Sequence, residues 1–157
     1  MKKIAIGQAG GPTAVINTSL VGFVESSIKN NLLYGVLNGY EGLVKDNLIE
    51  LKDETLDLVK KHKYIPGACL GSGRYQLTDE KIEIAVNNLK KNDINALVFI
   101  GGNGTMAALQ KIKNIADGIG YELQVIGIPK TVDNDLGMTD HAPGFASAAK
   151  FVAFSAR

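Results

Sequence analysis

Two glycine-rich loops are the first features of this chain that could do chemistry. Gly10 and Gly11 follow one short apolar stretch, and residues 101–104 read Gly-Gly-Asn-Gly after another. Glycine lets backbone N–H groups approach a phosphate with no side chain between them, and a following helix adds the positive end of its dipole. Neither loop has the spacing of a dinucleotide fingerprint or a Walker loop. One such loop fits a tight turn as well as a ligand site, but two of them favour phosphate binding.

A third loop, residues 129–135, offers reactive side chains. It reads Pro-Lys-Thr-Val-Asp-Asn-Asp and holds Lys130, Thr131, Asp133 and Asp135. A lysine can neutralise transferred charge, one aspartate can accept a hydroxyl proton, and another can hold magnesium. The loop therefore predicts phosphoryl transfer. The alternative is a turn held by hydrogen bonds of its own Asn and Asp side chains.

Arg74 is a further candidate, because it follows Gly71-Ser72-Gly73. Its guanidinium could grip a phosphate with two parallel hydrogen bonds. Taken alone, it fits an ordinary surface arginine equally well.

Alternating strand and helix patterns must position these loops. Short apolar runs predict strands at residues 3–8, 32–37, 96–100 and 124–128. Helical spacing predicts helices that start at residue 13 and near residue 106, and helices at 55–63, 78–91 and 145–157. Thr78 is the expected N-cap of the helix at 78–91, and residues 38–42 are predicted to form a loop. We therefore expect an α/β fold, a mostly parallel sheet with helices on both faces, with ligands beyond the carboxyl ends of the strands.

Length and charge limit the function classes. The 157 residues suffice for one domain with a buried core, residues 1–157. The 17 basic and 16 acidic residues are mixed along the chain, so we expect no nucleic-acid or membrane partner. No apolar run approaches the roughly 20 residues that span a bilayer. We expect a cytoplasmic protein.

Five segments together resemble 6-phosphofructokinases, in the order and spacing of that family. They are residues 7–17, 71–74, 101–105, 129–135 and 139–145, and Pro-Lys-Thr-Val-Asp-Asn-Asp is the most specific of them. The resemblance covers essentially the whole chain. It implies the α/β fold of the family's N-terminal, donor-binding domain.

The resemblance also implies an activity and a cofactor. The reaction would transfer a phosphoryl group to the 1-hydroxyl of fructose 6-phosphate, giving fructose 1,6-bisphosphate in glycolysis, with Mg²⁺ as cofactor. Asp133 would be the general base and Lys130 would stabilise the developing charge. Thr131, Asp133 and Asp135 would contact the sugar substrate. The donor phosphates would be held by Gly11, Arg74, Gly102, Asn103, Gly104 and Thr105.

The metal-binding residues implied by the resemblance are Asn103 and Asp135. The family often has aspartate where this chain has Asn103. Asparagine keeps an oxygen ligand but loses the charge, so phosphates, water and the aspartates at 133 and 135 would hold Mg²⁺.

Two positions give opposite indications about the phosphoryl donor. Lys130 resembles the pyrophosphate-dependent branch, since bacterial ATP-dependent enzymes usually have glycine there. Gly104 indicates ATP, because pyrophosphate-dependent enzymes commonly carry an aspartate that repels the α-phosphate of ATP. The first loop and residues 139–151 resemble the pyrophosphate branch. We therefore expect pyrophosphate, with ATP as the alternative.

Members of the family are at least twice as long as this chain, and their second half supplies groups that grip the sugar phosphate. We therefore expect a truncated chain with little activity by itself, which forms a homo-oligomer. One alternative is a non-catalytic nucleotide- or phosphate-binding fragment. Another is a lipid or dinucleotide kinase, whose Gly-Gly-Asp-Gly-Thr loop resembles residues 101–105 but which lacks the motif at 129–135.

Overall fold

A five-stranded sheet forms the centre of the computed structural model, which describes residues 1–156. The strands are β1 (Lys2–Gln8), β2 (Asn31–Val36), β3 (Leu48–Glu50), β4 (Ala96–Gly101) and β5 (Gln124–Pro129). Their order across the sheet is β3-β2-β1-β4-β5, and all neighbours are parallel except β3, which runs antiparallel to β2. The predicted mostly parallel α/β fold is confirmed.

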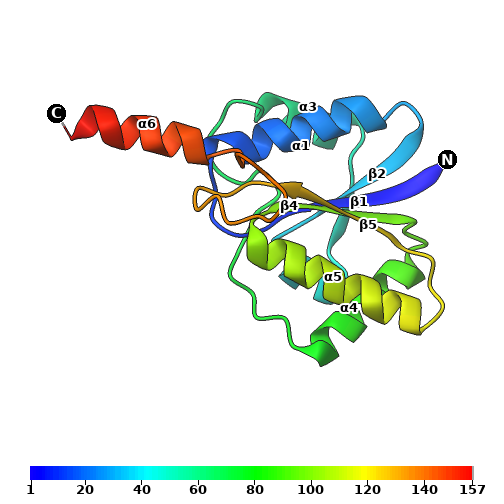
Figure 1. Cartoon of the computed structure of the whole chain (residues 1–157). Helices are drawn as coiled ribbons and strands as arrows, with labels where there is room; N and C mark the ends of the chain where they lie inside the picture. The colour runs from blue at the N-terminus through cyan, green and yellow to red at the C-terminus, as the bar shows by residue number, and fades with distance from the viewer. Residues whose placement is uncertain (157) are drawn as a thin grey trace.

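Helices cover both faces of this sheet (Figure 1). On one face lie α1 (Ala14–Ser27) and α3 (Asp53–Lys61), and on the other lie α4 (Asp79–Lys91) and α5 (Asn103–Gly118). Two separate apolar clusters fill the layers, one reaching Ile16 and Leu20 of α1, the other Ile82 of α4 and Ile112 of α5. The last helix, α6 (Phe145–Ser155), extends away from the body of the molecule, and every residue in it is at least partly exposed.

Strand β4 is buried along its full length, as its continuous apolar run predicts. Its Phe99 lies against Gly7 of β1, where an added Cβ would come within 2.4 Å of the ring. Glycine is therefore needed at position 7 for these two strands to pack around the ring.

Three elements differ from the sequence predictions. The predicted loop at 38–42 contains the start of a short helix, α2 (Tyr40–Val44), in which a Cβ on Gly42 would meet the carbonyl oxygen of Leu37 at 1.9 Å. Helix α5 begins at Asn103 and not near 106, because the amides of Thr105 and Met106 already bond to the Gly102 carbonyl. The antiparallel strand β3 was not predicted, because three residues are too few to show a periodic pattern.

The prediction for α4 is confirmed in detail. Thr78 is its N-cap, and the Thr78 hydroxyl accepts a hydrogen bond from the Lys81 amide at 3.4 Å. The four apolar residues of its stripe are all buried: Ile82, Ala85, Val86 and Leu89. Capping and burial therefore act together to fix this helix on the sheet.

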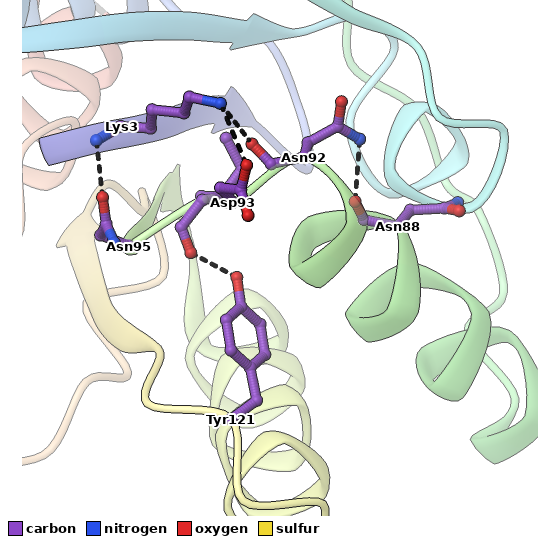
Figure 2. Close-up of polar contacts among 7 residues, drawn as sticks. Lys3, Asn88, Asn92, Asp93, Asn95 and Tyr121 are labelled. Carbon is purple, nitrogen blue, oxygen red and sulfur yellow. Dashed lines mark hydrogen bonds and ion pairs between the residues drawn. The ribbon is translucent and has the colours of Figure 1, made fainter.

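A polar cluster secures the amino-terminal end of the sheet (Figure 2). The backbone amide of Lys3 donates to Asn95 Oδ1 at 2.8 Å, and the side-chain Nζ of Lys3 donates to the Asn92 carbonyl at 3.1 Å. The Tyr121 hydroxyl donates to the Ile94 carbonyl, and burial raises the pKa of Tyr121 to about 12. These contacts hold the turn between α4 and β4, at the end of the sheet opposite the predicted ligand loops.

Candidate active site

A cavity of about 840 Å³ opens at the carboxyl ends of β1, β4 and β5. Every residue that the sequence predicted for the site lines it: Gly11, Arg74, Gly102, Asn103, Gly104, Thr105, Lys130, Thr131, Asp133 and Asp135. The structure therefore brings together segments that are far apart in the chain. This is the edge of the sheet where parallel α/β folds bind ligands.

Two helix N-termini border the cavity, those of α1 and α5. Within the described chain, the first turn of each helix holds no acidic residue. Neither helix, in the part of the chain that the structure describes, has a side-chain hydrogen bond at its N-cap, so the positive end of each helix dipole can face an anion. The amide of Ala9 donates to the Ile100 carbonyl at 2.9 Å and so joins the two glycine loops at the ends of β1 and β4.

Lys130 connects its own loop, residues 129–135, to the first glycine loop. The residue is only 6% exposed, and its Nζ donates to the Gly11 carbonyl at 2.5 Å. Burial lowers the pKa of Lys130, and the negative charge of Asp133 partly offsets that shift. A desolvated ammonium at this place can stabilise an anion more strongly than an exposed one.

The 129–135 loop is held by its own polar side chains. The Thr131 hydroxyl accepts from the Asp133 amide at 3.1 Å and donates to Asp135 Oδ1 at 3.4 Å. Asn134, whose φ is 53°, accepts from the Ala142 amide at 2.7 Å. The predicted alternative, a side-chain-bonded turn, is thus present, but Asp133 and Asp135 are exposed and line the cavity. The loop can be both a structured turn and a reactive one.

Arg74 reaches the cavity from an irregular segment between α3 and α4. It is exposed and lines the cavity wall. The Ser72 hydroxyl donates to the Gly10 carbonyl at 2.5 Å, which ties this segment to the first glycine loop. Arg74 therefore lies where its guanidinium can reach an anion bound at the glycine loops.

Tyr40 is a cavity residue that sequence reasoning missed. It is 8% exposed, its ring stacks on Phe99 with centroids 4.8 Å apart, and its hydroxyl donates to the Thr105 carbonyl at 3.4 Å. Burial raises the pKa of Tyr40 to about 12, so the hydroxyl keeps its proton. Tyr40, Tyr75 and Leu77 make this part of the cavity apolar. The only sequence signal was an aromatic residue directly after Asn-Gly at a strand end.

Asn103, Asp133 and Asp135 are the residues that could hold a magnesium ion. All three line the cavity and offer oxygen atoms, which this cation prefers. Among residues 1–156, no group of three or more His, Cys, Asp or Glu side chains is arranged to bind a metal. The oxygen atoms of Asn103, Asp133 and Asp135 fit a Mg²⁺ ion whose remaining ligands are water and substrate phosphates.

In the described part of the chain, no helix combines the length and apolarity needed to cross a bilayer.

Comparisons with known proteins agree on one family. The family model described as phosphofructokinase matches residues 3–156. A sulfofructose kinase from Alkalicoccus urumqiensis is 52% identical over 99% of this chain and 40% of that protein. The pyrophosphate–fructose 6-phosphate 1-phosphotransferase of Rhodospirillum rubrum is 39% identical over 96% of this chain and 38% of that protein. Enzymes named ATP-dependent 6-phosphofructokinase also match.

The fold agrees as well. The crystal structure of a pyrophosphate-dependent phosphofructokinase from Marinobacter aquaeolei superposes with a TM-score of 0.88 at 36% identity, covering 99% of this chain and 40% of that one. The chain thus spans about two fifths of the length of the curated relatives that it matches first.

Proposed function

The chain belongs to the phosphofructokinase family, whose members are phosphotransferases, and we propose that it is the donor-binding domain of an enzyme that phosphorylates the 1-hydroxyl of fructose 6-phosphate. We propose pyrophosphate as the donor. The observation that carries the proposal is the single cavity that gathers two glycine loops, a buried lysine and exposed aspartates.

The donor half of the cavity suits a polyphosphate. The N–H groups around Gly11 and Gly102 to Gly104 lie at helix N-termini, and Arg74 adds a forked cation. Bound Mg²⁺, with Asn103 and Asp135 among its ligands, would neutralise phosphate charge. The donor would thus be held mainly by backbone dipoles and by cations.

The acceptor half has a carboxylate and a cation on the same loop, Asp133 and Lys130. Asp133 would remove the proton from the 1-hydroxyl as its oxygen attacks phosphorus, and Lys130 would stabilise the charge that develops on the transferred group. Thr131 and Asp135 would orient the sugar, because their mutual hydrogen bond fixes both groups beside Asp133. General-base catalysis of this kind typically contributes about 10²- to 10⁴-fold.

The donor preference rests on Lys130. Its buried ammonium beside Gly11 suits a short, dense anion. ATP is the second candidate, since a Cβ on Gly104 would meet no described atom within 4 Å apart from its chain neighbours and the backbone of its own helix. The apolar end of the cavity could accept a base. A fragment that binds a nucleotide or phosphate without transferring it is the third.

A second acceptor is favoured by one observation. The relative with 52% identity is named a sulfofructose kinase, and a fructose with a sulfo group carries the same kind of 1-hydroxyl for Asp133. We further propose a cytoplasmic homo-oligomer with fructose 6-phosphate and pyrophosphate as its small-molecule partners.

Donor and acceptor can be tested in two steps. First, isothermal titration calorimetry on the 157-residue chain would compare pyrophosphate, ATP and phosphate, each with Mg²⁺. Second, the chain would be joined to the remaining part of the Rhodospirillum rubrum relative and assayed with fructose 6-phosphate or sulfofructose and with either donor.

We expect pyrophosphate to bind more tightly than ATP, and turnover to be fastest with pyrophosphate and fructose 6-phosphate. Asp133→Asn keeps the shape of the side chain and should lower kcat by about 10²- to 10⁴-fold without abolishing donor binding. Faster turnover with ATP, or with sulfofructose, would replace the corresponding part of the proposal. Donor binding without turnover in every pairing would favour the non-catalytic alternative.

A further inference from the structure

Two fully buried amide side chains flank the cavity-lining residues 9–13 along the chain and are outside the groups assigned to the reaction. Gln8 is the last residue of β1 and is 0% exposed, and Asn17 lies in the first turns of α1 and is 1% exposed. Buried polar groups are costly unless they are hydrogen-bonded, so their partners show what they do.

Both amides use their hydrogen-bonding groups on a common network. Gln8 Nε2 donates to Asn17 Oδ1 at 2.9 Å and to the Ile16 carbonyl at 3.2 Å. Gln8 Oε1 accepts from the Leu70 amide at 2.9 Å. Asn17 Oδ1 also accepts from the Cys69 amide at 2.9 Å. Turning either amide over would bring donors against donors, so the network has one arrangement.

The partners of this network belong to the segment that carries Arg74. Asn17 Nδ2 donates to the Ile65 carbonyl at 2.8 Å, so the network holds this segment at residues 65, 69 and 70. The Leu70 carbonyl in turn accepts from the Asn38 amide at 2.8 Å. Because the segment has neither helix nor strand, these bonds replace the backbone ladder that would otherwise fix it.

Residues 71–74 lead from this network of hydrogen bonds to the cavity. Gly71 takes a φ of +78°, Ser72 donates to the Gly10 carbonyl, and Arg74 lines the cavity. Two hydrogen bonds therefore connect the segment of Arg74 to β1 and the first glycine loop: Leu70 to Gln8, within the network, and Ser72 to Gly10, outside it.

We infer that Gln8 and Asn17 are positioning residues: they place Arg74 against the first glycine loop and so set the affinity for the phosphoryl donor without touching it. The inference rests on the proposed function of that cavity as a donor site. Apolar side chains of the same volume could fill the space but could not hold the Cys69 and Leu70 amides.

The test uses Asn17→Ala, with Gln8→Met as a second variant that keeps side-chain length and apolar packing. Thr18→Val is the matched control, because the Thr18 hydroxyl donates to the Lys63 carbonyl at 2.6 Å, at the beginning of the same segment and away from Arg74. Circular dichroism and thermal melting would establish that each protein is folded. Amide hydrogen exchange would then be measured for residues 65–74, and calorimetry would give the affinity for pyrophosphate and for ATP with Mg²⁺.

We expect Asn17→Ala to speed exchange at Cys69 and Gln8→Met to speed it at Leu70, with faster exchange onward to Arg74 in both. Donor affinity should fall on the order of tenfold, which corresponds to about 1.4 kcal/mol. Thr18→Val should leave donor affinity unchanged. Unchanged exchange at residues 69–74, or faster exchange with unchanged donor affinity, would overturn the inference.

The proposed function is judged separately. If the unmodified chain binds neither pyrophosphate nor ATP, the proposed donor site fails, while the exchange pattern still decides whether Gln8 and Asn17 hold residues 69–74 in place.

Discussion

Replacing Lys130 by methionine should weaken pyrophosphate binding strongly while leaving the fold intact. Methionine has nearly the same length, and the site is 6% exposed, so the apolar stem of the side chain is preserved. What is lost is the charged ammonium group, which donates a hydrogen bond to the Gly11 carbonyl. A phosphate bound on the Gly10 and Gly11 loop would lie close to this nitrogen, because a Cβ on Gly10 would be 4.0 Å from it.

The size of the effect follows from Coulomb's law. Unit charges about 4 Å apart interact by about 4 kcal/mol at an effective dielectric constant of roughly 20. Desolvation of the Lys130 ammonium, which lowers the lysine pKa, offsets part of this attractive free energy. We therefore expect a loss of about 2 to 4 kcal/mol, or roughly 30- to 800-fold in the dissociation constant.

The matched control is Lys111→Met. Lys111 also lines the cavity, but its side chain is 62% exposed and pairs with Asp79 at 3.6 Å. We expect this exposed charge to change donor affinity by less than about tenfold. Calorimetry with Mg²⁺-pyrophosphate would compare both variants with the unmodified protein. A Lys130→Met dissociation constant within threefold of the unmodified one would refute a direct donor contact.

The pH dependence gives an independent check on Lys130. Below its lowered pKa the lysine is charged in the free and in the bound protein. Above that pKa the free protein has a neutral lysine, which must take up a proton when the anion binds. Pyrophosphate affinity should therefore fall as pH rises through the lowered pKa, with up to one proton taken up. Lys130→Met should lose this slope, and the titration of pyrophosphate itself cancels in the comparison.

Three further substitutions test separate parts of the structure. Gly104→Asp should fold normally and weaken ATP binding at least about tenfold with little effect on pyrophosphate, since open space surrounds the site of its Cβ; calorimetry showing unchanged ATP affinity would contradict repulsion of the ATP α-phosphate as the basis of donor choice. Gly71→Ala should lower the free energy of unfolding, measured in urea, by about 1 to 3 kcal/mol, because φ at this position is +78° and the new Cβ would lie 2.4 Å from Asn38 Oδ1. A loss below about 0.5 kcal/mol would mean that the turn changes its backbone conformation at little cost. Thr78→Ala should lower the free energy of unfolding by about 0.5 to 2 kcal/mol, because the N-cap hydrogen bond of α4 is lost. Thr78→Ser is the control that keeps the cap, and equal stability of the two variants would argue against the cap.

The strands and helices that the sequence predicted are those with a local signal. β4 is an uninterrupted apolar run, and α4 combines an N-cap with a stripe of four apolar residues. β3 and α2 have only three and five residues, and both depend on neighbours that the local sequence does not contain. Gly42 illustrates this dependence, because only the nearby Leu37 carbonyl explains why glycine is required inside α2.

The same distinction applies to the cavity. Its lining residues could be predicted together because parallel strands end at one edge of a sheet, so the loops after β1, β4 and β5 must meet there. Tyr40 was missed because its place depends on stacking with Phe99. Gln8 was assigned to a strand and to the segment 7–17, but with no role in the site. The hydrogen bond from the Leu70 amide to Gln8 spans 62 residues, a separation at which composition and periodicity carry no information.

The strand order also has a consequence for how this protein folds. β1 pairs with β4 from Ile4 opposite Ala96 to Gln8 opposite Ile100, so the two glycine loops meet only after a very long stretch of chain has been closed. Closing such a loop costs entropy before any contact forms, and non-local parallel pairing is slow. We expect the site formed by the two glycine loops to appear in the last kinetic phase of refolding, after β1 has paired with β2. Stopped-flow refolding, with pyrophosphate added at successive delays, would then show binding competence lagging behind helix formation.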